Sequence, residues 1–579
     1  MTATLDDRES LSRTATGEVV PSARERFRPL TRLEDPLVGW TASISVMLLA
    51  LFLRLWKLGS PKEFSFDETY YAKDAWSMLN HGYVRGYVDK ADHKIIDGTT
   101  TGVWKDDPSM VVHPEVGKWL IALGEKAFGM DPFGWRIASA VVGSLMVLVM
   151  CRLVRRLTGS TLLGCVAGLL LCFDGMHLVL SRLALLDIFL AFFLLLAVHC
   201  LVVDRDWTRA RMVGEPEDDD EKDDDAKGRL RLPGSWGPTL WFRPWLALAG
   251  VCFGLACGTK WSAIWPLAAF GVLVLFWNAG ARRSLGVRWP LVKSAVADGV
   301  PAFLHLVVVA FVVYVATWTG WLIHAHEYED HLSNTQYTRF KDWAGECDDK
   351  RMKDPEYYDS REWSTAKDPD ASGPGELFQS LHSLWLYHHD VYVFHTKFLN
   401  CSTHVYASDP GGWLLLSRPV GVNAENDIKP GTKGCEAPKD SSCLRRVELI
   451  GTPVLWWGGA LALMYAVVAW VGKRDWRYGL ALVGVASTWL PWELNDDRPI
   501  FSFYASAILP FTIIALTLVL GEILGRAPVA SARRTAGTIV AGSFFVLVLL
   551  NFAWFWPIWT NGLLTHSEWL DRIWLSRWI

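Results

Sequence analysis

The chain has 579 residues, of which 51% are hydrophobic and 32 are tryptophan, and its formal net charge is -4. This length would suit several soluble domains, but apolar runs of about 20 residues recur, and each can cross the roughly 30 Å hydrocarbon core of a bilayer. We therefore predict an all-α, polytopic membrane protein. A net charge this small, without a basic stripe, argues against nucleic-acid binding.

Residues 1–36 come before the first apolar run and are polar, with several arginines. They lack the apolar core of a signal peptide, so we predict a disordered cytosolic tail. About eleven apolar runs follow as predicted membrane spans. They cover approximately residues 38–58, 135–154, 162–179, 183–203, 244–258, 261–278, 296–318, 451–471, 477–492, 503–524 and 537–557.

Basic connections between these runs predict the orientation. Four short connections contain "RLVRRLTG", "ARRSLGVR", "GKRDWR" and "GRAPVASARR", and loop 204–243 combines "RDWTRARM" with the acidic run "EPEDDDEKDDD". Basic loops tend to stay in the cytosol, so the N-terminus is predicted to be cytoplasmic. The C-terminus and two long loops, 59–134 and 319–450, are then extracytoplasmic.

This topology divides the chain into five parts. They are a cytosolic tail (1–36), a membrane module (37–318) that includes outer loop 59–134 and the acidic cytosolic loop 204–243, a large outer loop (319–450), further membrane helices (451–557) and an outer tail (558–579). In the tail, Trp569, Ile573, Trp574 and Trp578 have helical spacing. This spacing predicts an amphipathic surface helix, although the alternative of a simple aromatic anchor is favoured.

The cysteines agree with the predicted orientation. Six of the ten lie in predicted spans, and the other four lie in loop 319–450, namely Cys347, Cys401, Cys435 and Cys443. An even number of cysteines on the oxidising side predicts two disulfides, and four free thiols are the alternative. The eight-residue separation makes Cys435 with Cys443 the favoured close pair.

The first outer loop begins with an acidic pair, Asp67 and Glu68, in "FSFDETYYAKDAWSML". Ser65 and Glu68 match an S-x-x-E capping box, so the pair can simply start a helix at the membrane surface. Taken alone, the pair is more often structural than functional. Its surroundings in the same loop favour a functional role.

Further along this loop, "HPEVGKWLIALGEKAFG" predicts a second interfacial helix that Pro114 opens and Gly129 closes. Its apolar stripe suits a helix that lies along the membrane. His113 and Lys118 are polar exceptions near its start, and Lys118 has the alternative of a surface lysine that reaches into solvent.

Ionisable residues also lie near the outer ends of several spans. They are Arg136, Asp174, Arg182, Asp187, Lys260 and Arg498. Charged groups at membrane depth are costly and usually mark function, although Arg182 with Asp187 also suits an internal ion pair. Six such groups at one face predict a cavity that opens outward. Because transport needs polar groups along a path through the bilayer, this pattern favours an enzyme over a carrier.

The residue types in this pattern fit group transfer from a lipid-linked phosphate. Arginine and lysine bind phosphate and can stabilise the charge that develops on a departing phosphate. A carboxylate can take the proton from an attacking hydroxyl. The predicted site therefore combines a cationic donor side with an acidic acceptor side.

Several of these stretches together resemble motifs of the protein O-mannosyltransferases, and most closely those of actinobacterial members. They are "FSFDETYYAKDAWSML", "HPEVGKWLIALGEKAFG", "GWRIASA", "LSRLALLD", "GTKW", "LWLYHHDVYVFHTKFLNCSTHVYASDPGGWLLLSRPV" and "NDDRPIFSFY". They occur in the family's order over residues 64–504. One departure is Glu115, where the family often has a second proline. The outer loop 319–450 is also too short for the MIR domain of eukaryotic members.

The resemblance implies the GT-C glycosyltransferase fold. It also implies inverting transfer of mannose from polyprenyl-phosphate mannose to Ser or Thr of secreted proteins at the outer face of the plasma membrane. The role of catalytic base falls on Asp67, with Glu68 assisting or contacting the acceptor. Donor binding falls on Arg136, and we add further candidates for the phosphate and sugar, namely Arg182, Lys118, Lys260, Arg498, Asp187 and His113. On the acceptor side we place His404, Tyr70 and Tyr71.

Membrane lipids and secreted polypeptides are the expected partners, and coupling to the Sec translocon is an inference from the family alone. Five histidines within 23 residues, His382, His388, His389, His395 and His404, raise the possibility of a divalent metal site. A metal is not favoured, because fixed cations can receive the leaving charge. Two other functions stay open. They are transfer of a polyprenyl-linked sugar to a glycan or lipid, and transport of a lipid-linked sugar.

Overall fold

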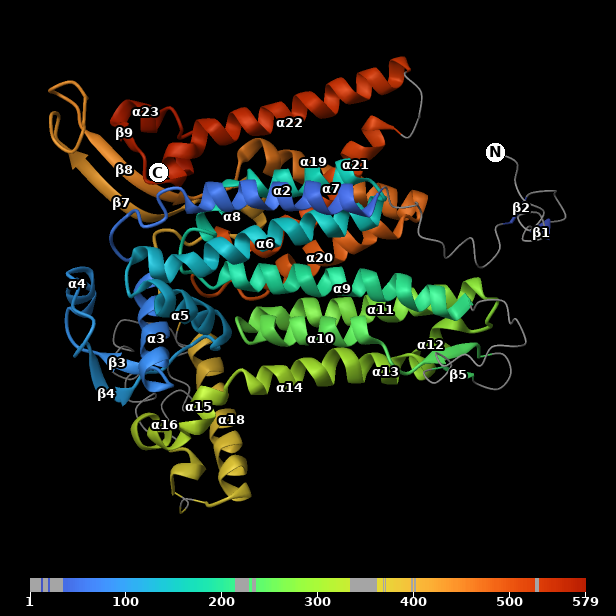
Figure 1. Ribbon diagram of the computed structural model, residues 1–579, viewed down its shortest axis with the longest axis horizontal. Coiled ribbons are helices and arrows are strands. Elements are labelled where there is room, and N and C mark those ends of the chain that lie inside the picture. The colour runs from blue at the N-terminus through green and yellow to red at the C-terminus, as the bar shows by residue number, and fades with distance from the viewer. Residues whose placement is uncertain are drawn as a thin grey trace.

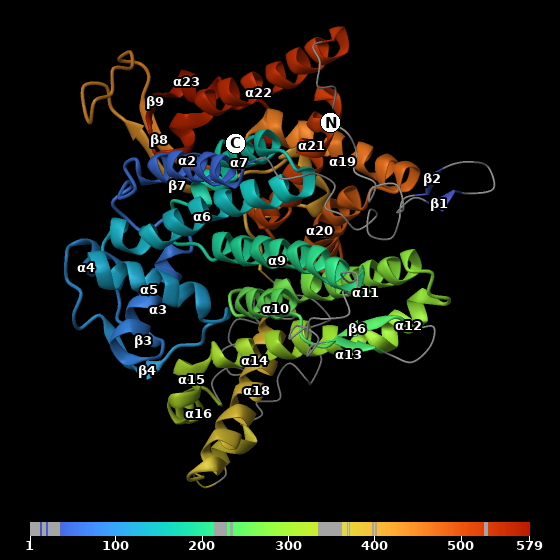
Figure 2. The same cartoon turned by 45° about the vertical axis from the view of Figure 1, so that its right-hand side comes forward.

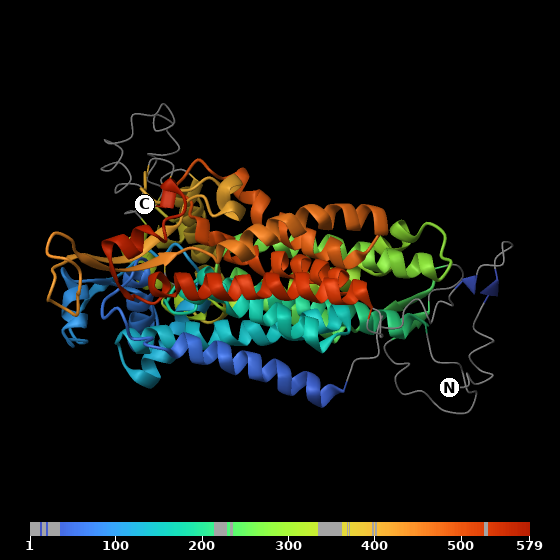
Figure 3. The ribbon, with the colours of Figure 1, turned by 90° about the horizontal axis from the view of Figure 1, so that it is seen from above.

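The computed structural model of the protein describes residues 35–213, 236–333, 362–367, 369, 371–396, 399, 402–525 and 531–578, together with three short strands elsewhere. Long helices run side by side along the long axis and form a bundle (Figure 1). Viewed from above, the same helices keep this common direction (Figure 3). In the described residues, seven helices are long and apolar enough to cross a membrane.

The helices of the bundle match the predicted spans closely. They are α2 (Pro36–Leu55), α6 (Pro132–Thr158), α7 (Thr161–Cys172), α8 (Gly175–Leu180), α9 (Asp187–Val213), α10 (Pro244–Cys257), α11 (Ile264–Ser284), α12 (Pro290–Ala297), α13 (Gly299–Phe303), α14 (Val309–Ala316), α19 (Pro453–Lys473), α20 (Trp476–Glu493), α21 (Leu509–Leu524) and α22 (Ala532–Trp559). A short π-helical segment (Leu304–Val308) joins α13 to α14.

One predicted span, 162–179, is divided into α7 and α8. The break lies at Asp174, whose carboxylate accepts hydrogen bonds from the backbone N–H of His177 and of Thr452 and from the indole of Trp456. Asp174 therefore caps α8 and ties it to the start of α19. Asp174, which the sequence singled out as a charged residue at the outer end of this span, therefore has a structural role as a helix cap.

Local sequence signals explain the helical hairpin of α5 (Val116–Phe128) and α6. Asp131 caps α6 by accepting the N–H of Gly134, and Pro132 occupies the first turn. Gly129, at φ 98°, ends α5 as predicted. The two helices come so close that a Cβ on Gly124 would lie 2.4 Å from the carbonyl oxygen of Gly134. Only glycine fits at this contact.

The elements of the two long loops gather at one end of the bundle, on the left of Figure 1. From the first outer loop come α3 (Glu68–His81), β3 (Arg85–Tyr87), α4 (Ala91–Ile96), β4 (Trp104–Pro108) and α5. From the second come α16 (Ala325–Leu332), α18 (Pro374–Thr396), β7 (Val420–Ile428) and β8 (Cys443–Leu449), preceded by the short α15 (Thr319–Ile323). In Figures 1 and 2, α18 runs steeply across the direction of the bundle.

A small antiparallel sheet was not predicted. Its strand order is β7–β8–β9, with Val420 opposite Leu449 and Cys443 opposite Thr565 in β9 (Leu563–Thr565). The predicted disulfide between Cys435 and Cys443 is confirmed and closes the β7–β8 hairpin. The other two cysteine candidates, Cys347 and Cys401, lie outside the described residues.

The amphipathic helix predicted for the C-terminal tail is wrong. The tail forms β9, the five-residue α23 (His566–Leu570) and a short 3-10 turn, Ser576–Trp578. The Trp569 indole donates to the Glu448 carboxylate at 3.1 Å, and the Trp578 indole donates to the Leu416 carbonyl at 2.7 Å. Trp569 and Trp578 are buried against the rest of the protein, and these hydrogen bonds hold their indole rings in place.

Candidate active site

The acidic pair lies where the chain enters α3, and its two carboxylates have different surroundings. Asp67 is the N-cap residue by position, but its side chain makes no capping hydrogen bond. The predicted capping box is only half formed: Glu68 accepts the Ser65 N–H at 2.9 Å, while the Glu68 N–H donates to the Ser65 carbonyl and not to its hydroxyl. The capping role expected for the pair therefore falls on Glu68 and leaves the Asp67 carboxylate available.

Glu68 is completely buried in an ion pair with Arg136. The guanidinium donates from Nε to Oε1 at 2.8 Å and from Nη2 to Oε2 at 2.7 Å, so both carboxylate oxygens are engaged. The Ala184 N–H donates to Oε1 as well, at 2.9 Å. A carboxylate with these four donors has little capacity left for a substrate, so Glu68 does not fit the expected contact with an acceptor.

Arg136 is similarly occupied. Beyond Glu68, its guanidinium donates to the hydroxyl of Ser65 and to the carbonyls of Leu58, Pro61 and Glu63. The side chain has no solvent-exposed surface. These contacts fix the segment that leads to Asp67, and the donor-binding role expected for Arg136 stays a prediction.

Two more cations expected at the donor are also used within the protein. Arg182 donates to four backbone carbonyls at the end of α2, from Leu53, Arg54, Trp56 and Lys57. It does not pair with Asp187, so that alternative is wrong. Lys118 is buried, pairs with Asp74 at 3.0 Å and donates to the His113 carbonyl, so it is not a surface lysine either. α5 accordingly packs against α3 and α6.

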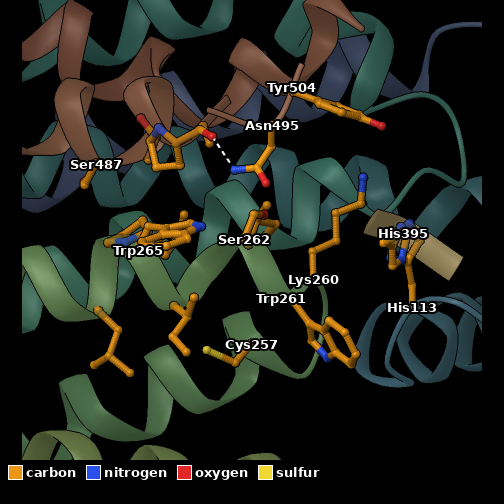
Figure 4. Close-up of a pocket in the computed structure, with 18 of the residues that line it drawn as sticks. His113, Cys257, Lys260, Trp261, Ser262, Trp265, His395, Ser487, Asn495 and Tyr504 are labelled. Carbon is orange, nitrogen blue, oxygen red and sulfur yellow. Dashed lines mark hydrogen bonds between the residues drawn. The ribbon is translucent and has the colours of Figure 1, made fainter. Parts of the chain in front are cut away.

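The four remaining donor-side candidates meet at one cavity of about 690 Å³. Its lining includes His113, Asp187, Lys260 and Arg498, which come from four segments far apart in the sequence. In Figure 4, Lys260 extends between Tyr504 on one side and the pair His113 and His395 on the other. The sequence therefore identified four polar residues of this cavity, although not their partners.

Lys260 is held by Asp187 at the first position of α9. Its ammonium lies 3.0 Å from Oδ1 and 2.8 Å from Oδ2 of this carboxylate, and 5.0 Å from the ring centroid of Tyr504. An ammonium has three N–H donors, so one can still point into the cavity. The bidentate contact fixes the direction of the lysine side chain.

Asp67 lies within electrostatic reach of this pair. Burial raises the pKa of the Asp67 carboxyl to about 6, the Lys260 cation opposes this rise, and the Asp187 anion adds to it. The Tyr71 hydroxyl donates to Asp67 Oδ2 at 3.4 Å and favours the charged form. A carboxylate with such a pKa is mostly ionised at neutral pH and can still accept a proton readily.

Arg498 and two histidines form the other polar wall. His395 Nε2 faces the Val112 carbonyl at 3.1 Å and must donate to it, so Nδ1 is free to accept from Arg498 at 3.4 Å. The His113 ring stacks on His395 at 5.6 Å. Burial lowers the pKa of His395 to about 4, with the Arg498 cation adding to this, and burial also lowers that of His113. Both rings are therefore neutral at pH 7.

Arg498 has no carboxylate partner within the described residues. Beside Lys260, it is therefore a cation that an anionic ligand can use. The apolar part of the same lining is open to the outside at Ile264, Trp265 and Phe311, all of which are exposed. One cavity thus joins a cationic end to an apolar flank on the bundle surface.

The predicted acceptor-side residues separate into two groups. Tyr71 contacts Asp67, and the His404 ring packs against Phe66 at 6.1 Å, directly before the acidic pair. Phe66 itself has φ 54°, a strained backbone conformation for a bulky residue. Tyr70 is 63% exposed, and its expected role stays a prediction.

The histidines that suggested a metal site have separate partners. His388 hydrogen-bonds to the Tyr314 hydroxyl and to the Leu384 carbonyl, whereas His395 faces Arg498. Across the described parts of the chain, no three metal-ligating side chains cluster.

Sequence reasoning grouped these histidines by their proximity along the chain and therefore missed His388 and His395 as cavity residues. Tyr504 was missed as a site residue, although "NDDRPIFSFY" had been singled out.

Comparison with known proteins now identifies the family. The family model described as dolichyl-phosphate-mannose-protein mannosyltransferase matches residues 44–213, and that of the C-terminal four-span region of protein O-mannosyltransferase matches residues 380–578. The chain belongs to the protein O-mannosyltransferase family. The resemblance seen in the sequence motifs is thereby confirmed.

Curated relatives extend this match to nearly the whole chain. A polyprenol-phosphate-mannose–protein mannosyltransferase of Mycolicibacterium smegmatis is 36% identical over 97% of this chain and 96% of the relative. Its counterpart in Mycobacterium tuberculosis is 35% identical over 97% and 95%, and that in Corynebacterium glutamicum 29% over 96% of each. The similarity to these relatives thus extends over nearly the whole chain.

A solved structure confirms the fold. The Saccharomyces cerevisiae protein O-mannosyltransferase Pmt1-Pmt2 complex bound to the sugar donor has a TM-score of 0.65 to this chain, with 15% identity, and the match covers 98% of this chain and 96% of that one. The GT-C membrane fold implied by the sequence motifs is therefore confirmed.

The buried pair predicts a specific effect of mutation. Replacing Arg136 by Met leaves the Glu68 carboxylate buried without its partner, which typically costs about 3–5 kcal/mol. We expect the thermal unfolding temperature of the purified protein to fall by several degrees, while the Michaelis constant of the remaining folded enzyme for its lipid donor changes little. Glu63→Gln, an exposed carboxylate change nearby, is the matched control and should leave stability unchanged. Unchanged stability with a raised donor Michaelis constant in Arg136→Met would instead indicate direct donor contact.

Proposed function

We propose that the chain transfers mannose from polyprenyl-phosphate mannose to the hydroxyl of Ser or Thr in secreted proteins. The observation that carries this proposal is the cavity that joins Lys260 and Arg498 to an apolar flank, with the Asp67 carboxyl within electrostatic reach of Lys260. The chemistry of a lipid-linked sugar phosphate matches these three features. Family membership supports the same reaction, since the curated relatives are named for it.

Donor binding uses the cationic end and the apolar flank together. The phosphate of the donor would accept hydrogen bonds from the Arg498 guanidinium and from the free N–H of Lys260. The prenyl chain would lie over Ile264, Trp265 and Phe311, where apolar side chains face the lipid. The neutral rings of His113 and His395 close the wall around the phosphate without adding charge.

Transfer then needs one displacement at the anomeric carbon. The acceptor oxygen forms a bond to C1 of mannose while the bond from C1 to the phosphate oxygen breaks, so the configuration at C1 inverts. The hydroxyl proton passes to the Asp67 carboxylate, and polyprenyl phosphate leaves with its electron pair. Lys260 and Arg498 stabilise the negative charge that develops on the phosphate.

Positioning residues complete this assignment. Glu68 and Arg136 fix the chain that carries Asp67, and Asp187 aims Lys260. Tyr71 orients the Asp67 carboxylate through its hydroxyl. Holding donor and acceptor together in this geometry supplies much of the remaining acceleration. His404 and Tyr70 are assigned to the acceptor side, beside the strained Phe66 turn.

The proposal places the cavity at the extracytoplasmic face of the plasma membrane and the N-terminus in the cytoplasm. Basic residues support this, because Arg155 and Arg156 lie in the last turn of α6 and Lys473 lies in the last turn of α19. The Cys435–Cys443 disulfide also suits an oxidising side. An acceptor must cross the membrane before it reaches this face, so delivery by the Sec translocon belongs to the proposal.

The direct test is mannose transfer from synthetic polyprenyl-phosphate mannose to a Ser- and Thr-rich peptide. We expect transfer by the purified wild type and a loss of about a hundredfold or more in Asp67→Asn, with donor binding retained, because only the base is removed. Asp67→Glu, which keeps the carboxylate, should retain more activity than Asp67→Asn. Equal rates in wild type and Asp67→Asn would reduce Asp67 to a helix-terminal residue, and no transfer by folded wild type would point to another acceptor.

The raised pKa of Asp67 predicts the pH dependence of the reaction. The base acts in its ionised form, so the kcat/KM for transfer should be level above about pH 6 and fall about tenfold per pH unit below it. Tyr71→Phe removes a hydrogen bond to the charged form, so the pKa of Asp67 rises and the falling limb moves to higher pH. The measurement is the initial rate between about pH 5 and 8, with folding checked at each pH. A profile that stays flat through pH 6 would contradict the assignment.

A further inference from the structure

A second cavity lies among the membrane helices, away from the candidate active site. It has a volume of about 200 Å³ and is lined by Trp40, Arg152, Arg155, Arg156, His199, Val203 and Trp245. His199 follows Asp187 by 12 positions in α9, which places it roughly 18 Å further along the bundle. The three arginines belong to the last two turns of α6. The cavity is therefore separate from the one that holds Lys260.

Two buried polar atoms in this lining have no hydrogen-bond partner among the described residues. They are Nη1 of Arg152 and Nδ1 of His199. Buried polar groups are normally satisfied, and each one left unpaired costs free energy. Two such atoms beside one cavity indicate a missing polar partner that can face both.

The charge of the lining shows which kind of partner fits. Arg156 pairs with Asp206 at 3.0 Å, whereas Arg152 has no carboxylate partner in the described part of the chain. The Arg152 guanidinium lies 3.9 Å from the ring centroid of Trp40, and Arg155 donates to the Thr161 hydroxyl. Several guanidinium groups and an imidazole in one cavity suit an anion with several oxygens, and phosphate has that shape.

The position of the cavity indicates how this anion arrives. Trp40 and Trp245 lie near the starts of α2 and α10, and 47% and 39% of their surfaces are exposed. Tryptophans at the ends of membrane helices typically lie at the level of lipid headgroups. A cavity of about 200 Å³ leaves room for a phosphate group.

We propose that this cavity binds the phosphate group of an anionic membrane lipid at the end of the bundle opposite the candidate active site. The phosphate oxygens accept hydrogen bonds from Arg152 Nη1 and from His199, in the tautomer that carries a proton on Nδ1. The lipid's acyl chains leave between Trp40 and Trp245 along the helix surfaces. Basic pockets between membrane helices are recognised sites for such headgroups.

The test compares lipids that differ only in the headgroup. Short-chain phosphatidylglycerol and phosphatidylcholine with the same acyl chains are titrated onto the detergent-purified full chain, and retained lipid is counted by native mass spectrometry. Inorganic phosphate is added in a third arm. The variants are Arg152→Gln and Arg152→Lys, and Arg283→Gln is the matched control, because Arg283 is an exposed arginine in the last turn of α11.

We expect wild type and Arg283→Gln to retain phosphatidylglycerol in preference to phosphatidylcholine. In Arg152→Gln the affinity for phosphatidylglycerol should fall about tenfold or more, as expected for loss of a charge-assisted hydrogen bond, and Arg152→Lys should recover part of it. Equal retention of the two lipids by wild type would overturn the proposal. So would an equal loss in Arg283→Gln, or Arg152-dependent binding of free phosphate without binding of the lipid. Circular dichroism of Arg152→Gln checks its folding, and Arg152→Lys provides the same test if that variant is unfolded.

Discussion

The buried ion pair between Glu68 and Arg136 is the interaction on which the candidate active site depends. Two charges removed from water are tolerated only when hydrogen bonds occupy nearly all their donors and acceptors. Here the guanidinium of Arg136 and both carboxylate oxygens of Glu68 are occupied in this way. The pair joins the start of α3 to the start of α6 and, through the Ala184 N–H, to the segment before α9. The position of Asp67 follows from this junction, because it precedes Glu68 directly.

The adjacent carboxylates of Asp67 and Glu68 consequently differ in their capacity to accept a proton from a substrate. The Glu68 carboxylate accepts four hydrogen bonds, whereas burial raises the pKa of Asp67 to about 6 and its carboxylate makes no capping hydrogen bond. Lys260 shows the same division of roles with Asp187, which holds the ammonium but leaves one donor available. Fixed partners around a few uncommitted groups are what electrostatic preorganisation requires.

The sequence predicted the bundle well because long apolar runs are typical of membrane spans. It predicted the Cys435–Cys443 disulfide from the predicted extracytoplasmic loop and the close spacing of the two cysteines. It also identified which ionisable residues are unusual, but not which way they face. Arg136, Arg182 and Lys118 are as costly in a membrane protein as Lys260, yet the first three satisfy internal carbonyls and carboxylates. Partners distant in the chain decide such roles, and a single sequence does not reveal them. The small sheet was missed because polar and charged residues interrupt the apolar pattern of β7 and β8.

The most direct test of this account is a cryo-electron microscopy structure of the protein with a non-transferable phosphonate analogue of polyprenyl-phosphate mannose. The account predicts the phosphonate within about 3 Å of Lys260 Nζ and of the Arg498 guanidinium, the prenyl chain over Phe311, and the Asp67 carboxylate facing the acceptor side of the mannose C1. Density for the phosphonate beside Arg136, or a mannose C1 that Asp67 and a bound acceptor hydroxyl cannot reach, would contradict it.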